Sequence, residues 1–157
     1  MSPANYDARV LNDIAAAASA TGDAATRGKR VAEMIRQACD CFWVGIFEIA
    51  SDEAHAVAWT GAEAPAFLHF PLTRGITRDV VRTRKSALVN DVLKDSRYLV
   101  AYSATRAEIV TPIIDAMGSV VGTIETDADK VNAFSNADVQ FLDQCASRLT
   151  ALVTKRG

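Results

Sequence analysis

Apolar residues recur at helical spacing at both ends of the chain. The first segment, over residues 4–19, predicts a helix, and a break at Thr21-Gly22-Asp23 precedes a second one. The apolar stripe of that second helix follows the spacing i, i+3, i+4, i+7: Val31, Met34, Ile35 and Ala38. Near the C-terminus, Ser135-x-x-Asp138 resembles a capping box and introduces a third long helix. Its apolar face is expected to carry Val139, Leu142, Cys145, Ala146, Leu149 and Val153.

The middle of the chain instead alternates short β-rich runs with turns. Strands are predicted from runs of β-branched and aromatic residues over residues 42–49, 55–61, 67–72, 87–91, 108–114 and 119–126. Gly75 opens a short helix that runs to about residue 84. The turn Asp115-Ala116-Met117-Gly118 makes the last two strands a hairpin. The segment 92–105 shows no clear period, and we expect it to act as a lid that Tyr98 and Tyr102 line.

This order predicts an α+β fold with a central, mainly antiparallel sheet. The N- and C-terminal helices should cover one face of the sheet, and the middle segment should close the other face over a ligand pocket. We expect one domain over residues 1–157. Its N-terminal helices span 4–41, its sheet and pocket 42–127, and its C-terminal helix 135–154.

Charge and composition narrow the function classes. The chain of 157 residues has 17 basic and 19 acidic side chains and a net charge of -2, so it has no global reason to bind nucleic acid or an acidic membrane. No secretory signal pattern opens it and no apolar run approaches bilayer length, so we expect a cytoplasmic protein. The three cysteines and two histidines lack zinc-site spacing, and neither a metal nor a cofactor is expected.

Three acids interrupt the apolar strands. Glu125 and Asp127 are two residues apart and would share one strand face, and the hairpin could bring Glu108 near them. Clustered carboxyl groups in a concavity would favour an ammonium or amidinium ligand and would raise one another's pKa. On spacing alone, however, acids at a solvent-exposed sheet edge are the favoured explanation.

An aromatic pair occupies the first strand. Trp43 and Phe47 share a face, and Gly45 between them would leave space beside the two rings for a ligand. Ordinary core packing explains aromatic residues on a strand at least as well. The cysteines Cys39, Cys41 and Cys145 are interpreted mainly as small hydrophobic residues, because Asp40 has the wrong charge to lower the pKa of Cys41 and the other two lie on amphipathic helices.

Several motifs together resemble the GAF domain family, and within it the stand-alone proteins typified by free methionine-(R)-sulfoxide reductase. They lie between about residues 30 and 153: Phe42-Trp43-Val44-Gly45-Ile46-Phe47, Arg74-Gly75-Ile76-Thr77, the run from Ser103 to Ile113, Val121-Gly122-Thr123-Ile124-Glu125-Thr126-Asp127, and Ala133-Phe134-Ser135-Asn136-Ala137-Asp138. The resemblance implies a GAF/PAS-like fold. It also implies that the matching residues Trp43, Phe47, Glu108, Glu125 and Asp127 bind ligand, which reverses the preference for edge acids.

The catalytic cysteines of those reductases do not carry over. The resemblance implies that Phe67, Thr77 and Ala101 occupy the three positions at which those reductases have cysteines. Sulfoxide reduction needs a thiolate to attack sulfur and a second thiol to resolve the product. We therefore expect a non-catalytic sensory domain with no catalytic residues. The expected ligand-binding residues are Trp43, Phe47, Phe67, Thr77, Tyr102, Glu108, Glu125 and Asp127.

Two alternatives remain. One is an enzyme, either a divergent reductase that uses Cys41 or an acid–base catalyst that uses the pocket carboxylates. The other is a homodimer module in which the apolar stripes of the terminal helices pack across a two-fold axis, and this is compatible with ligand sensing. With one domain in the sequence, the output of a sensor is expected to pass to a downstream signalling protein.

Overall fold

The computed structural model describes residues 6–100 and 102–153, which form an α+β fold around one antiparallel sheet. The strand order is β3-β2-β1-β6-β5-β4, and every paired neighbour is antiparallel. The strands are β1 (Trp43–Ala50), β2 (Glu53–Thr60), β3 (His69–Pro71), β4 (Ala87–Val89), β5 (Ala107–Ile114) and β6 (Val120–Ala128). The predicted α+β sheet is confirmed.

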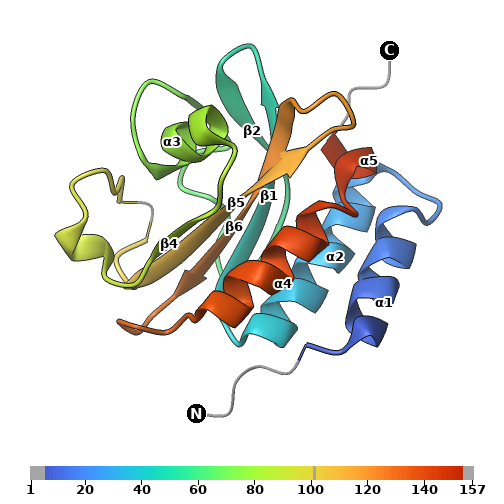
Figure 1. The fold of residues 1–157 in the computed structure, drawn as a ribbon, viewed down its shortest axis with the longest axis horizontal. Helices are drawn as coiled ribbons and strands as arrows, with labels where there is room; N and C mark the ends of the chain where they lie inside the picture. The colour runs from blue at the N-terminus through green and yellow to red at the C-terminus, as the bar shows by residue number, and fades with distance from the viewer. Residues whose placement is uncertain (1–5, 101, 154–157) are drawn as a thin grey trace.

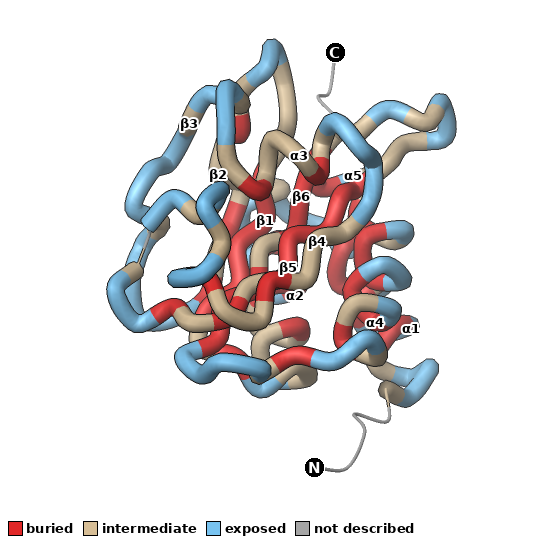
Figure 2. The backbone as a smooth tube through the Cα atoms, turned by 60° about the vertical axis from the view of Figure 1, so that its left-hand side comes forward, coloured by how far each residue is buried: buried red, intermediate tan, exposed pale blue. Residues whose placement is uncertain are grey.

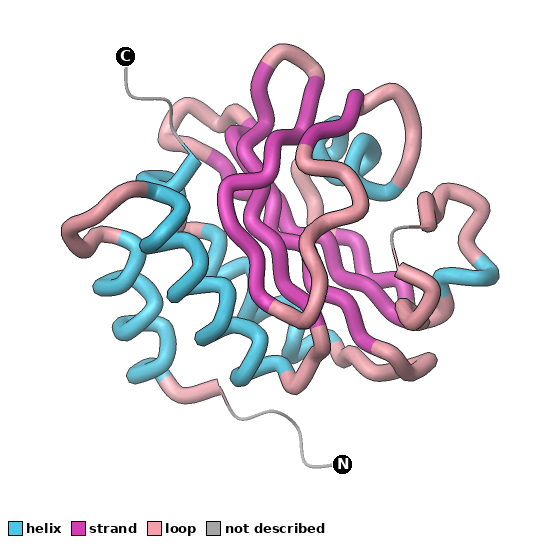
Figure 3. The backbone as a smooth tube through the Cα atoms, turned by 180° about the vertical axis from the view of Figure 1, so that it is seen from behind, coloured by secondary structure: helices cyan, strands magenta, loops and turns pink. Residues whose placement is uncertain are grey.

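Helices of both chain ends lie side by side on one face of this sheet (Figures 1 and 3). They are α1 (Ala8–Ala18), α2 (Ala24–Cys39), α4 (Asn136–Ala146) and the short α5 (Thr150–Val153). The main hydrophobic core fills the layer between them and the sheet, and Figure 2 shows the buried backbone concentrated there. Its fully buried side chains include Ile14, Val31, Ile35, Leu142 and Leu149. The apolar stripes that suggested a dimer interface are thus buried within the single chain.

The first two helices begin at aspartate caps. Asp7 has an extended backbone and accepts a hydrogen bond from the Arg9 amide, so α1 begins at Ala8 and the predicted start at residue 4 lies outside the described residues. Asp23 caps α2 in the same way through the Thr26 amide. Side-chain acceptors for the otherwise unpaired amides therefore set where both helices start.

The C-terminal helix is shorter than the predicted single helix over 135–154. It begins as predicted, with the Ser135 amide donating to Asp138 in a capping box, but it stops at Ala146. Both the Ser147 hydroxyl and the Arg148 guanidinium donate to the Gln144 carbonyl, and the Leu149 amide bonds back only three residues. These polar side chains compete for a carbonyl that would continue the helix, and the tight turn still buries Leu149 completely.

The opposite face of the sheet is covered by the middle segment, which holds α3 (Ile76–Thr83) and the 3-10 turn η1 (Val92–Lys94) and adds β4 to the edge of the sheet. A second apolar cluster of Ile76, Val80, Val89, Val92 and Val110 fixes this layer to β5. Tyr98 packs against that cluster, whereas the sequence suggested that it lines a lid over the ligand. The described part of the chain contains no helix that is both long and apolar enough to cross a membrane.

Candidate functional site

Three carboxyl groups converge on the sheet face opposite the four packed helices. Strand β6 continues through Asp127, so Glu125 and Asp127 point to the same side. In the β5–β6 pair, Glu108 lies directly opposite Asp127. In the β1–β6 pair, Trp43 lies opposite Asp127 and Gly45 opposite Glu125. The cross-strand register therefore places the three acids beside the aromatic residues of β1.

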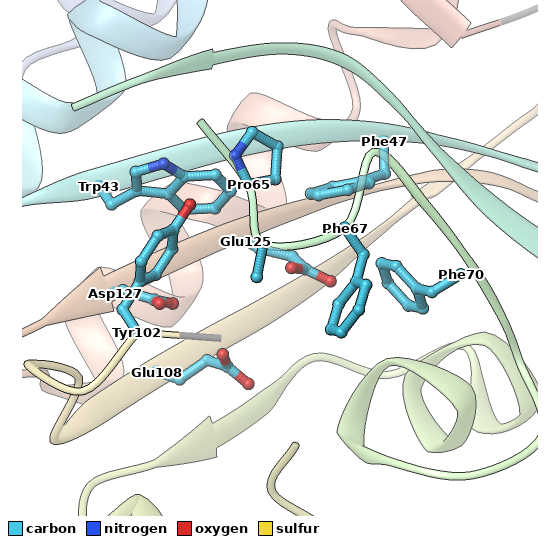
Figure 4. Close-up of a pocket in the computed structure, with 10 residues that line it drawn as sticks. Trp43, Phe47, Pro65, Phe67, Phe70, Tyr102, Glu108, Glu125 and Asp127 are labelled. Carbon is cyan, nitrogen blue, oxygen red and sulfur yellow. The ribbon is translucent and has the colours of Figure 1, made fainter. Parts of the chain in front are cut away.

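A cavity of about 50 Å³ lies over these strands (Figure 4). Ten residues line it: Trp43, Phe47, Pro65, Ala66, Phe67, Phe70, Tyr102, Glu108, Glu125 and Asp127. Of the eight residues proposed from the sequence, only Thr77 does not line it. Thr77 lies in the first turn of α3 and instead donates a hydrogen bond to Glu125 Oε1 at 2.7 Å. Phe67 lines the mouth with 62% of its surface exposed.

The aromatic wall is continuous. Ring centroids are 5.4 Å apart between Tyr102 and Trp43, 6.4 Å between Trp43 and Phe47, and 5.7 Å between Phe47 and Phe70. Gly45 does not leave the free space that its position suggested. A Cβ atom there would lie 2.2 Å from Trp43 Cη2 and 3.0 Å from Phe47 Cε2, because the two rings close over the glycine.

Sequence reasoning missed three lining residues. Phe70 lies on β3 opposite Ala54, and Pro65 and Ala66 belong to the loop between β2 and β3. Phe70 was part of the strand predicted over residues 67–72, but the sequence did not indicate that its side chain lies on the same face of the sheet as Phe47. Pro65 and Ala66 follow no period at all, so only the path of the loop brings them to the cavity.

The two carboxylate oxygens of Asp127 differ in their hydrogen bonds. Asp127 is 2% exposed, and its Oδ2 accepts a hydrogen bond from Thr105 Oγ1 at 3.0 Å. Its Oδ1 is buried and has no donor while Glu108 is ionised, because two carboxylates can only accept. A proton on Glu108 supplies the missing donor and links the two groups. A bound cation with an N–H group could do the same.

Burial raises the pKa of all three acids, and the charge of Asp127 raises the pKa values of Glu108 and Glu125 further. The pKa of Glu108 lies well above its usual value, first through burial and then through the charges of Asp127 and Glu125. Burial raises the pKa of Glu125 to about 7, against the hydrogen bond from Thr77 that lowers it. The pKa of Asp127 rises to about 6, again through burial. All three acids therefore ionise at a higher pH than free carboxyl groups do.

All three cysteines lie on the far side of the sheet. Cys41 and Cys145 are buried in the helix-side core, and Cys39 is partly buried against it. Burial raises the pKa of Cys39 to about 12 and raises the pKa values of the other two thiols further. Cys41 therefore neither reaches the cavity nor forms a thiolate near neutral pH. Among the described residues, no group of three or more His, Cys, Asp or Glu is arranged to hold a metal ion.

A family model described as GAF domain matches residues 23–153. The chain belongs to the GAF domain family. Its sequence is 26% identical over 115 residues to GAF domain-containing protein A of Dictyostelium discoideum, covering 73% of this chain and 71% of that protein. It is 27% identical over 112 residues to free methionine-R-sulfoxide reductase of Saccharomyces cerevisiae, covering 69% and 61% of the two chains.

The fold of this GAF domain is also similar to those of solved free methionine-R-sulfoxide reductases. The type II free methionine-R-sulfoxide reductase of Thermoplasma acidophilum superimposes with a TM-score of 0.77 at 25% identity, over 83% of this chain and 92% of the other. A structure of free methionine-R-sulfoxide reductase from Neisseria meningitidis gives a TM-score of 0.81 at 24% identity, over 92% and 86%. The resemblance seen in the sequence motifs is thus confirmed at the level of family and fold.

Proposed function

We propose that this GAF domain binds a small amine-bearing cation and does not transform it. The observation that carries the proposal is the buried Asp127 Oδ1, which has no donor while Glu108 is ionised and lies among three converging carboxyl groups under an aromatic wall. A buried carboxylate oxygen without a donor is costly, and an ammonium group supplies both a compensating charge and the hydrogen bond that Oδ1 lacks. The fold itself is one that binds small molecules.

The position of the thiols supports a binding role without redox chemistry. No cysteine is among the ten cavity-lining residues, and all three thiols have raised pKa values. Of the places where reductase cysteines are expected by resemblance, Phe67 lines the cavity mouth and Thr77 bonds to Glu125. The third, Ala101, lies outside the described residues.

A ligand panel tests the proposal. Melting temperature and calorimetric titration are measured with amines, amino acids, purines and oxyanions, for the wild type and for Asp127→Asn. Amine binding that Asp127→Asn weakens at least tenfold is the expected result. The matched control is Asp129→Asn, an exposed acid two residues further along, which should bind like the wild type. Absence of any amine effect on the wild type would contradict the proposal.

A divergent reductase is the second candidate, and it rests on the similarity to the yeast and Thermoplasma enzymes. Its assay is loss of free methionine-(R)-sulfoxide with a thiol reductant, comparing the wild type with Cys41→Ser. Because Cys41 is buried on the opposite face, we expect no turnover in either protein. Thiol-dependent turnover that the substitution abolishes would establish the enzyme instead.

The sensory output, the cytoplasmic location and the homodimer also remain proposals. A sensor with this architecture would pass a ligand-induced change to a signalling partner or to a second copy of the chain. Since the helix stripes are buried internally, a dimer would have to use other surfaces. Light scattering at micromolar concentration, with and without ligand, distinguishes a stable dimer from a monomer.

A further inference from the structure

The aromatic wall offers a ligand no hydrogen-bond donor. The indole Nε1 of Trp43 donates to the Glu63 carbonyl at 3.0 Å, and the Tyr102 hydroxyl donates to the Ala64 carbonyl at 2.7 Å. Both polar groups therefore bind the loop between β2 and β3, and only the ring carbons of Trp43 and Tyr102 are available to contact a ligand. The other uncharged lining side chains belong to Phe, Pro and Ala, which have no polar hydrogen.

The hydroxyl groups behind the acids are also occupied. Thr77 donates to Glu125 at 2.7 Å, and Thr105 donates to Asp127 at 3.0 Å. None of the ten lining residues is basic. Apart from protons on the acids themselves, every polar side-chain atom that the cavity presents is thus an acceptor. An anionic group of a ligand would meet carboxylates and find no side-chain partner.

The aromatic rings can contact the alkyl groups of a cationic ligand. Trp43, Phe47, Phe70 and Tyr102 surround the carboxyl groups on several sides, as Figure 4 shows. Aromatic faces attract ammonium ions through the ring quadrupole, and alkyl groups on the nitrogen lose water favourably against them. The combination of rings and acceptors fits an alkylated ammonium group better than a bare metal ion or a neutral sugar.

We infer that the ligand is a small organic monocation without an acidic group, an alkylammonium whose N–H reaches Asp127 and whose alkyl groups lie against the rings. This inference rests on the proposed function and narrows its ligand class. It sets aside free amino acids, because their carboxylate would enter an acidic, donor-poor cavity at a high electrostatic cost.

Size limits the buried part of the ligand. The cavity measures about 50 Å³, well below the ~150 Å³ of an engineered cavity that holds benzene. An ammonium group with one or two short alkyl substituents fits this scale. A longer substituent would leave past Phe67, which stands at the mouth and is 62% exposed.

Binding should release protons. The groups that face the ammonium are Glu108 from β5, Glu125 and Asp127 from β6, and Tyr102 from the covering segment. Glu63 and Asp95 add charge further out. The pKa values of about 7 for Glu125 and about 6 for Asp127 mean that both side chains are partly protonated below neutral pH. A bound cation stabilises the ionised carboxylates, so these protons leave when it binds. Affinity should rise between pH 6 and pH 8, with proton uptake by the buffer.

The deciding experiment titrates the intact protein with matched probes at pH 8. Dimethylammonium should bind at least ten times more tightly than N,N-dimethylglycine, which adds only a carboxymethyl group. Dimethylammonium should also bind at least ten times more weakly to Asp127→Asn than to the wild type, because the amide no longer offers the N–H group a charged acceptor. Calorimetry in two buffers of different ionisation enthalpy at pH 6.5 should reveal the released proton.

The two levels of the proposal fail differently. Dimethylglycine binding as tightly as dimethylammonium would overturn the monocation inference and leave the amine-binding function intact. Equal binding of dimethylammonium to the wild type and to Asp127→Asn would overturn the contact to Asp127. If no amine binds in any form, the proposed function itself fails. A further variant, Glu108→Gln, places an amide donor in the cluster. It should reduce the difference in affinity between dimethylammonium and N,N-dimethylglycine.

Discussion

Glu108 on β5 and Asp127 on β6 are direct cross-strand partners, so two carboxyl groups face each other inside the cavity. Like charges in that position destabilise a sheet, and burial adds to the cost. We expect the arrangement to lower the stability of the ligand-free fold, and the proposed cation would offset this cost. The first prediction follows from this cross-strand pair.

Removing one charge of the pair should stabilise the empty protein. Asp127→Asn is expected to raise the free energy of unfolding at pH 8 by about 1 kcal/mol, because it removes a buried charge and its amide can donate to Glu108 in place of the shared proton. Urea denaturation measures the change. Asp129→Asn, at an exposed position, should stay within about 0.5 kcal/mol of the wild type. A loss of stability in Asp127→Asn would show that the hydrogen bonds of the carboxylate, including the one from Thr105, outweigh the cost of burying its charge.

The second prediction concerns pH. Glu125 has a raised pKa of about 7, so the folded state holds its proton where the unfolded chain, with a value of 4.5, has lost it. Its contribution to stability is therefore fully present below about pH 4 and declines as pH rises through 7. The stability difference between Glu125→Gln and the wild type should grow in favour of the variant from pH 5 to pH 8. A difference that shrinks over this range would contradict the raised pKa.

Gly45 should tolerate no side chain. Gly45→Ala places a Cβ 2.2 Å from Trp43 Cη2, so the rings must move apart. We expect a loss of about 1–3 kcal/mol in unfolding free energy and a weakened affinity for the amine probe. The double variant with Trp43→Phe has a smaller ring and should regain stability. If Gly45→Ala alone behaves like the wild type, the rings do not close over this position.

Tyr6 on the helix side offers a contrasting test. Its ring stacks on Phe141 with centroids 3.9 Å apart, and its hydroxyl donates to Asp138. Tyr6→Phe keeps the stack and removes a bond to a charged acceptor, so stability should fall by about 1.5 kcal/mol. Ligand affinity should not change, because the site lies across the sheet. Tyr102→Phe, which frees the loop at Ala64, should instead lower affinity.

The thiols should be unreactive in the folded protein. Burial raises the pKa of Cys41 and Cys145 and brings that of Cys39 to about 12, so almost no thiolate exists at pH 8. Iodoacetamide labelling followed by mass spectrometry should modify all three cysteines in urea and almost none in buffer. Rapid labelling of Cys41 in buffer would reopen the reductase alternative.

The sequence by itself determined the order of elements and the layer to which each helix belongs. Helical and strand periods are local properties, so the stripe of Val31 and Ile35 and the last hairpin could be read without a structure. The shared face of Glu125 and Asp127 followed from the same period of two, once β6 was known to reach that far.

Only the tertiary structure decided how these pieces meet. The register that sets Glu108 against Asp127 depends on pairing between strands, which no single-strand pattern encodes. Closure of Trp43 and Phe47 over Gly45 depends on packing, and the arrival of Pro65 and Phe70 at the cavity depends on a loop path without period. The end of α4 at Ala146 likewise reflects competition for one carbonyl that helical spacing cannot reveal.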